Sequence, residues 1–272
     1  MLYSPALSFF RIILMFLWVI SSATLHFIIS RISKKYFFVS YNLFFHGLIR
    51  IFGIKIRFSG SPERKKTLFV SNHISYLDIL ILGSSVNALF VAKSEIKKWP
   101  VINKLCSIGK TIFVKRKDLR NVKGQMSLIE ENLKNGFNII LFPEGTSSDG
   151  CKVLDFKSSL FGLVEIPDIK DYKIQPISIS YSKLDGLPLD KIFRPFLAWF
   201  GEMDLLSHAW KFLGLGISEV EINFLQPKKF SFFSGRKQAS KFCHTKISDQ
   251  VIKDSRSLEI DDKIKLSEFK LL

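Results

Sequence analysis

A histidine and an aspartate stand five positions apart, shortly after the apolar run Thr67–Ser71. On a straight helix, positions i and i+5 lie about 140° apart, because each residue turns by about 100°. His73 and Asp78 would therefore not share a face. The spacing works if His73 lies on a strand-to-helix turn and Asp78 lies in the first turns of the helix. The carboxylate then accepts a hydrogen bond from one imidazole nitrogen and fixes the tautomer, which leaves the other nitrogen as a general base.

No matching nucleophile accompanies this pair. Ser71 and Ser75 lack the G-x-S-x-G context of a nucleophile elbow. A histidine–aspartate pair without a nucleophile indicates that the base deprotonates the hydroxyl group of an acceptor directly. The alternative is a structural pair, in which His73 is a capping or core residue. Spacing alone favours that alternative.

Two further motifs end apolar, strand-like runs, where ligand sites of open α/β sheets lie. The loop Phe142-Pro143-Glu144-Gly145-Thr146 offers hydroxyl and backbone N–H groups that could hold an oxyanion. Lys115 and Arg116 end another run; arginine suits bidentate phosphate recognition and lysine supplies a point charge. The alternatives are an ordinary strand-end turn and solvated basic residues.

Short β-branched or aromatic runs alternate with helix-like stretches from about residue 67 onward. The predicted strands are Thr67–Ser71, Ala88–Ala92, Thr111–Lys115, Asn138–Phe142, Ile174–Tyr181 and Glu219–Leu225. The predicted helices between them include Leu77–Ser85, Glu95–Ser107 and Leu119–Asn135. This alternation predicts an α/β fold with a mixed, mostly parallel sheet flanked by helices.

The N-terminal region is strongly apolar. Residues 12–29 carry no charge and would span about 27 Å as a helix, close to a hydrocarbon core of roughly 30 Å. Basic residues at 31, 34 and 35 place the following side in the cytoplasm. The next stretch, Tyr36–Ile54, is amphipathic and is predicted to lie at the membrane interface. The alternatives for the apolar run are a signal peptide and a buried core helix.

These features predict two parts: membrane-anchoring helices in residues 1–57 and an α/β domain in residues 58–272. The chain has 272 residues, 47% of them hydrophobic, which excludes disorder as its main state. Its net charge of +16 indicates an anionic partner, namely a phosphate substrate, an anionic membrane surface or nucleic acid. Residues 226–248 contain six Lys or Arg and no acid; they form either a membrane-facing segment or a solvated tail.

Several site classes lack local support. The three cysteines are scattered, without C-x-x-C spacing, which argues against a disulfide framework or a zinc ribbon. Neither a P-loop nor a G-x-G-x-x-G motif is present. The sequence also lacks a helix-turn-helix signal and an aromatic RNA-binding motif, so we predict no nucleic-acid partner.

Together, the three motifs resemble those of the glycerolipid acyltransferase superfamily, which includes the 1-acyl-sn-glycerol-3-phosphate acyltransferases. The resemblance covers about residues 65–185, and four blocks match in order. They are Asn72-His73 to Asp78; Lys93, Glu95 and Pro100 with residues 112–116; Phe142-Pro143-Glu144-Gly145-Thr146; and residues 174–179 around Pro176.

The resemblance implies a role for each matching residue. His73 would be the general base and Asp78 would orient it, while Pro176 would form part of the wall near the acyl chain. The residues that would bind the substrate head are Arg116, Glu144, Gly145, Thr146 and Lys115. Acyl-CoA or acyl carrier protein would supply the acyl thioester, and no metal or prosthetic group is expected. A basic, amide-rich pocket would stabilise the charge that builds on the thioester oxygen.

The resulting hypothesis is transfer of a fatty acyl group to a lysolipid hydroxyl at the cytoplasmic face of the inner membrane. The expected acceptor is 1-acyl-glycerol-3-phosphate, which would give phosphatidic acid. Ser147 departs from the arginine frequent in phosphatidate-forming enzymes, and residues 199–208 resemble a subgroup that includes lyso-ornithine lipid acyltransferases. Lyso-ornithine lipid is therefore an alternative acceptor. A non-catalytic, basic membrane-binding protein is the alternative from another class.

Overall fold

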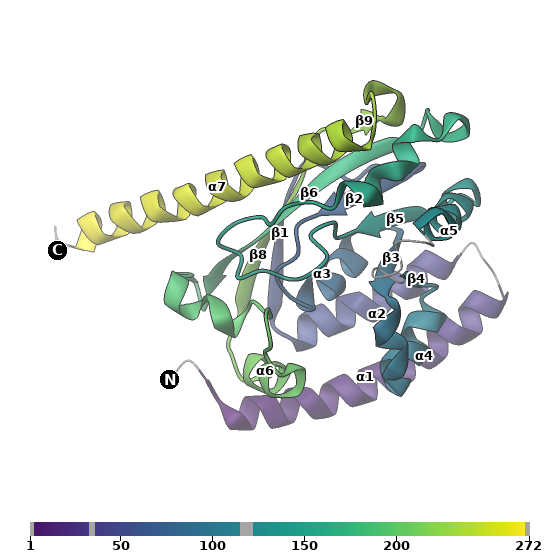
Figure 1. The fold of residues 1–272 in the computed structure, drawn as a ribbon. Helices are drawn as coiled ribbons and strands as arrows, with labels where there is room; N and C mark the ends of the chain where they lie inside the picture. The colour runs from purple at the N-terminus through teal and green to yellow at the C-terminus, as the bar shows by residue number, and fades with distance from the viewer. Residues whose placement is uncertain (1–2, 33–35, 115–121, 270–272) are drawn as a thin grey trace.

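The computed structural model describes residues 3–32, 36–114 and 122–269. Within these ranges, nine strands form one sheet with the order β1-β8-β6-β2-β5-β3-β4, and β7 and β9 pair with β6 (Figure 1). The strands are β1 Ile54–Ser59, β2 Thr67–Ser71, β3 Ala88–Lys93, β4 Ile112–Val114, β5 Asn138–Leu141, β6 Lys173–Leu184, β7 Leu187–Pro188, β8 Ser218–Phe224 and β9 Lys228–Lys229.

The sheet is mixed and mostly parallel along its main path, as predicted. Neighbouring strands run parallel from β6 through β2, β5 and β3 to β4, and β1 is parallel to β8. The pairing of β6 with β8 is antiparallel. Every residue of β2 and β5 is buried. This is expected of central parallel strands that are covered on both faces.

Helices cover the sheet on both sides. They are α1 Pro5–Ile32, α2 Phe37–Ile51, α3 Leu77–Ser85, α4 Pro100–Ile108, α5 Val122–Lys134, α6 Leu205–Leu213 and α7 Arg236–Phe269. In Figure 1, α7 crosses the sheet at β6 on one side, while α1 and α2 lie on the other. Short 3₁₀ helices connect these elements at Ser94–Lys98, Ser158–Glu165, Pro167–Ile169, Lys191–Phe196 and Phe230–Phe232.

The predicted strands are all present, with ends shifted by no more than three residues, and α3 has the predicted bounds. Three strands escaped prediction, namely β1 and the two-residue strands β7 and β9. Strand β1 begins at Ile54, so the predicted boundary between residues 57 and 58 falls inside it. The predicted helix Glu95–Ser107 is divided into a 3₁₀ helix and α4, which begins at Pro100. Proline favours a first helical turn and interrupts a helix interior.

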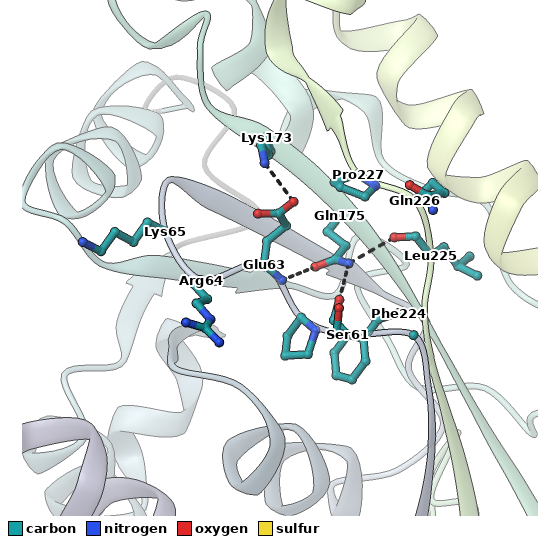
Figure 2. Close-up of a pocket in the computed structure, with 12 residues that line it drawn as sticks. Ser61, Glu63, Arg64, Lys65, Lys173, Gln175, Phe224, Leu225, Gln226 and Pro227 are labelled. Atoms are coloured by element: carbon teal, nitrogen blue, oxygen red, sulfur yellow. Dashed lines mark hydrogen bonds and ion pairs between the residues drawn. The ribbon is translucent and has the colours of Figure 1, made fainter.

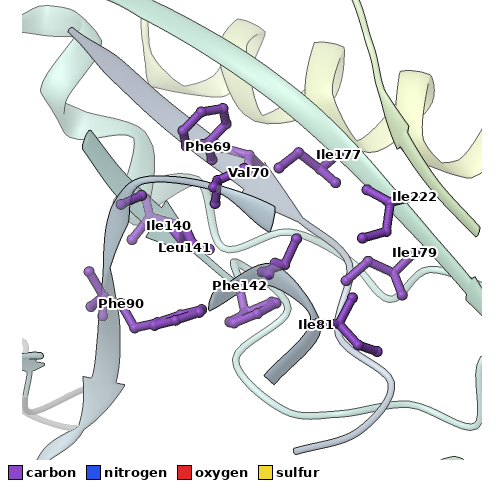
Figure 3. Packing of buried hydrophobic residues seen from close by; sticks show 14 of the residues in the cluster. Phe69, Val70, Ile81, Phe90, Ile140, Leu141, Phe142, Ile177, Ile179 and Ile222 are labelled. Atoms are coloured by element: carbon purple, nitrogen blue, oxygen red, sulfur yellow. The ribbon is translucent and has the colours of Figure 1, made fainter. Parts of the chain in front are cut away.

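The core forms where strand side chains meet α3. Figure 3 shows Phe69 and Val70 of β2, Ile140 of β5, Ile177 of β6 and Ile81 of α3 within one packed cluster. Burial of each such side chain stabilises the fold by about 1.5–3 kcal/mol. The loops that follow β2 and β5 therefore start from a rigid base.

The N-terminal helices are part of this packed structure. A side-chain carbon added to Gly47 of α2 would lie 2.0 Å from the Trp18 ring of α1, and one added to Gly83 of α3 would lie 2.6 Å from the Phe45 ring of α2. These glycines let α1, α2 and α3 stack closely. The amphipathic stretch thus buries one face of α2, including Tyr41 and Phe45, inside the protein.

Candidate active site

His73 and Asp78 meet in the turn that connects β2 to α3, as their spacing predicts. Nδ1 of His73 lies 2.8 Å from Oδ2 of Asp78. A carboxylate only accepts hydrogen bonds, so Nδ1 carries the proton in neutral His73. Its Nε2 makes no hydrogen bond with any described residue. The His73 side chain is 18% exposed and Asp78 is fully buried, so the free nitrogen has limited access to solvent.

Four hydrogen bonds hold the carboxylate of Asp78. Besides His73, the backbone N–H groups of Ile74 and Ser75 donate to Oδ2 at 2.7 and 3.0 Å. The hydroxyl of Tyr181 on β6 donates to Oδ1 at 2.8 Å. Desolvation, with the negative charge of Asp78 beside it, holds the pKa of Tyr181 well above its ordinary value, so this hydroxyl keeps its proton. The buried carboxylate is thus fixed with one oxygen toward the imidazole.

Glu144 links the turn that contains His73 to the loop after β5. Its Oε1 accepts the backbone N–H of His73 at 2.7 Å, and its Oε2 accepts that of Leu154 at 2.9 Å. Burial raises the pKa of Glu144 from 4.5 to about 7, the two N–H donors oppose this rise, and the charge of Asp78 adds to it. Both oxygens of the Glu144 side chain therefore accept a hydrogen bond from a backbone N–H group. A direct contact of Glu144 with the acceptor stays a prediction.

This raised pKa predicts a pH-dependent stability. Between pH 4.5 and 7 the folded chain retains the Glu144 proton and the unfolded chain releases it. The free energy of unfolding therefore falls as pH rises through this window, by about 3 kcal/mol in all. Glu144→Gln cannot ionise, so its urea midpoint, followed in detergent from pH 4.5 to 7.5, should lack this fall. If the urea midpoints of wild type and of Glu144→Gln changed with pH in the same way, the prediction would be contradicted.

The imidazole is positioned by packing and by backbone contacts. Its ring stacks on Phe142, with ring centres 4.3 Å apart. Asn72 exchanges two hydrogen bonds with the backbone of Ile179 on β6, at 2.8 and 2.9 Å. The carbonyl of His73 accepts the N–H of Ser148 at 2.9 Å. His73 is therefore positioned by three elements: the loop after β2, the loop after β5 and the strand β6.

A segment from the second half of the chain covers the His73 loop. The N–H of Trp199 donates to the carbonyl of Ile74 at 3.1 Å. The hydroxyl of Tyr76 lies 3.3 Å from Nδ1 of His208 on α6. Burial lowers the pKa of His208, which disfavours its charged form. These contacts join residues 199–208 to the turn that contains His73.

The other predicted site residues differ in their placement. Gly145 has a φ of +80°, which suits glycine, and Thr146 is exposed beside it. Pro176 is buried in β6, opposite Val70 of β2. Lys115 and Arg116 lie outside the described residues. Tyr181 was not predicted as a site residue, because its partner Asp78 is 103 positions away and no local pattern links the two.

A cavity of about 740 Å³ lies elsewhere, between the β1–β2 loop, β6 and the end of β8 (Figure 2). Lys173 on its wall pairs with the first residue of β2, whereas His73 follows the last. The length of β2, about 15 Å, separates the two. Some of its polar side chains are already engaged: Lys173 pairs with Glu63, and Gln175 bonds the backbone around it. The cavity is therefore not part of the His73 site.

The arrangement at His73 suits a general base: an oriented imidazole with one nitrogen that makes no hydrogen bond to the described residues, and a buried carboxylate behind it. In the part of the chain that the structure describes, no three His, Cys, Asp or Glu side chains cluster as metal ligands. The site thus provides a means of activating a hydroxyl group.

Comparisons with known proteins agree with this chemistry. Residues 54–180 match the family described as Acyltransferase. The chain is 35% identical over 216 residues to a lyso-ornithine lipid O-acyltransferase of Rhizobium meliloti, covering 76% of this chain and 74% of that protein. A 1-acyl-sn-glycerol-3-phosphate acyltransferase of Neisseria gonorrhoeae is 36% identical over 102 residues, or 37% of this chain and 40% of that one.

A solved structure shares the fold. The crystal structure of the 1-acyl-sn-glycerophosphate acyltransferase PlsC from Thermotoga maritima superimposes with a TM-score of 0.68 at 22% identity. The match covers 91% of this chain and 94% of that one. Together with the sequence match over three quarters of the chain, these findings show that the chain belongs to the acyltransferase family and is an O-acyltransferase.

Proposed function

We propose that the chain transfers a fatty acyl group from an acyl thioester to the free hydroxyl of a lysolipid. Nε2 of His73 removes the hydroxyl proton as the oxygen attacks the thioester carbonyl carbon. The tetrahedral intermediate collapses, the carbon–sulfur bond breaks, and the thiolate takes the proton back from the imidazolium. The observation that carries this proposal is the Nδ1–Oδ2 contact of 2.8 Å, which leaves Nε2 as the base.

We propose lyso-ornithine lipid as the acceptor. The support is the length of the match: the Rhizobium relative aligns over twice as many residues as the Neisseria glycerol-phosphate enzyme. The family resemblance of residues 199–208 agrees with this choice. Those residues contact the His73 turn, where they could select an acceptor. The competing acceptor is 1-acyl-glycerol-3-phosphate.

An acceptor panel tests the proposal. The full chain is purified in detergent and offered lyso-ornithine lipid, 1-acyl-glycerol-3-phosphate or a lysophosphatidylethanolamine, each with acyl-CoA or acyl carrier protein of one chain length. We expect turnover with lyso-ornithine lipid to exceed the others by at least about tenfold, a difference of 1.4 kcal/mol. If the enzyme preferred 1-acyl-glycerol-3-phosphate, that lipid would be the acceptor in place of lyso-ornithine lipid. If no lysolipid of the panel were turned over faster than by His73→Ala, the proposed function would be overturned.

We also propose how the chain meets the membrane. Helix α1 is long and apolar enough to cross a bilayer, and only 11% of its most apolar window is buried. Yet polar contacts tie it to the domain along its length: Ser8 bonds the carbonyl of Trp210, Arg11 those of Leu213 and Leu215, and Trp18 that of Phe44. These contacts favour a helix that lies along one leaflet. The proposed leaflet is the cytoplasmic one of the inner membrane, where thioester donors occur.

Exposed side chains of α1 should govern membrane binding. Leu17 and Ile20 are 62% and 65% exposed, and burial of a carboxylate in lipid is costly. We expect Leu17→Asp with Ile20→Asp to lower partition onto phosphatidylglycerol-containing vesicles by about 10–100-fold, and the residual binding to be salt-sensitive. Ile252→Asp on α7, 49% exposed, is the matched control. Equal vesicle flotation of both variants would contradict this arrangement.

Point substitutions serve this test better than deletion of residues 1–54. Deletion would remove Phe37, Tyr41 and Phe45 from the core, and it would strip α3 of the helix that packs on Gly83. Loss of membrane binding in such a truncated chain could not be separated from loss of folding.

A further inference from the structure

Arg194 lies beside the catalytic turn, outside the region matched by the family. It belongs to the 3₁₀ helix Lys191–Phe196, and its Nη1 donates to the carbonyl of Gly150. Gly150 has a φ of +74°, and a side-chain carbon added there would lie 3.2 Å from Ile74 and 3.4 Å from Nη1 of Arg194. The guanidinium group is therefore next to the residue that follows His73.

The charge of Arg194 is not compensated. Among the residues that the structure describes, no carboxylate lies within 4.0 Å of its nitrogens. Its Nε is buried and has no hydrogen-bond partner. A buried donor without a partner costs about 1–3 kcal/mol and is rare in folded proteins. By contrast, the guanidinium of Arg57 is paired with Glu219 at 2.6 Å.

In the loop that Arg194 contacts, the cations come only after Cys151, at Lys152 and Lys157. Residues 144–151 contain Glu144 and Asp149 but neither lysine nor arginine. Asp149 uses Oδ1 to accept the N–H of Cys151. Arg194, on the 3₁₀ helix Lys191–Phe196, therefore adds a positive charge next to the part of this loop that has no cation.

We infer that Arg194 binds the anionic head group of the acceptor lipid. The planar guanidinium matches a carboxylate or a phosphate through paired N–H donors. The carboxylate of an amino-acid head such as ornithine and the phosphate of glycerol phosphate share this chemistry. The inference rests on the proposed lysolipid acceptor.

Charge-blocked acceptors test the assignment in the full chain. Wild type, Arg194→Gln and Arg194→Lys are assayed with lyso-ornithine lipid and its carboxyl methyl ester, and with 1-acyl-glycerol-3-phosphate and 1-acylglycerol. Glutamine can still donate to Gly150 but carries no charge. Arg64→Ala, which removes a positive charge at the far end of β2, is the matched control. Thermal midpoints check that each variant is folded.

We expect Arg194→Gln to raise the KM for the charged acceptor by about 10–100-fold. The KM for the uncharged analogue and for the thioester should change less than about twofold. Arg194→Lys should recover part of the loss, and Arg64→Ala should behave as wild type. A loss of equal size on charged and uncharged acceptors would overturn the inference, because it would make Arg194 a structural residue; so would an unchanged KM.

The same data separate this inference from the proposed function. If wild type prefers the glycerol phosphate and Arg194→Gln loses only the phosphate-bearing acceptor, the proposed acceptor is wrong and the role of Arg194 stands. If wild type prefers lyso-ornithine lipid and Arg194→Gln treats the acid and its ester alike, the function stands and the role of Arg194 falls. Turnover of no lysolipid overturns both.

Discussion

We expect His73→Ala to lose about 10²–10⁴-fold in turnover, the usual contribution of a general base. The imidazole is oriented by Asp78 at 2.8 Å and by the ring of Phe142, and its Nε2 is available to take the acceptor proton. Without it, water or the thioester itself would have to remove the proton. The loss should fall on kcat, because the imidazole acts in the transition state more than in binding.

The backbone contacts of residue 73 survive this substitution. Its N–H still donates to Glu144 and its carbonyl still accepts from Ser148, so the fold and membrane attachment should persist. His46→Ala is a matched control, since His46 is exposed on α2 and bonds the carbonyl of Asn42 in its own helix. Turnover within a few-fold of wild type in purified His73→Ala would overturn the proposed base.

The local part of the site could be predicted because it lies within one turn. His73 and Asp78 are five residues apart, and a strand-to-helix turn is the local geometry that lets them meet. The loop after β5 could likewise be placed at the same sheet edge, because β2 and β5 are parallel neighbours. Parallel strands bring their carboxyl ends together whatever the separation in sequence.

The remaining parts depend on tertiary contacts that no local pattern encodes. Tyr181 reaches Asp78 from the middle of β6, within an apolar run where a tyrosine looks like any core residue. Arg194 reaches Gly150 from a helix whose sequence has no motif. Strand β1 escaped prediction because four of its six residues are exposed, and only its pairing with β8 makes it a strand of the sheet.

The function of Asp78 can be separated from its structural contacts by Asp78→Asn. The amide oxygen of asparagine can occupy the position of Oδ2 and accept from Ile74 and Ser75, while its amino group faces the Tyr181 oxygen. The turn should therefore persist. The negative charge that stabilises the imidazolium is lost, and we expect turnover to fall by about 10²–10⁴-fold, as in other enzymes that pair histidine with aspartate.

A double variant tests whether Asp78 acts through His73. If it does, His73→Ala combined with Asp78→Asn should be about as slow as His73→Ala alone, because the second change removes a partner that is already absent. Tyr181→Phe removes one hydrogen bond to Asp78 but leaves the negative charge of Asp78 in place. It should therefore lose far less turnover than Asp78→Asn. Losses that multiply in the double variant would mean that Asp78 contributes independently of the imidazole, and the pairing seen at 2.8 Å would then not be the source of its effect on the rate.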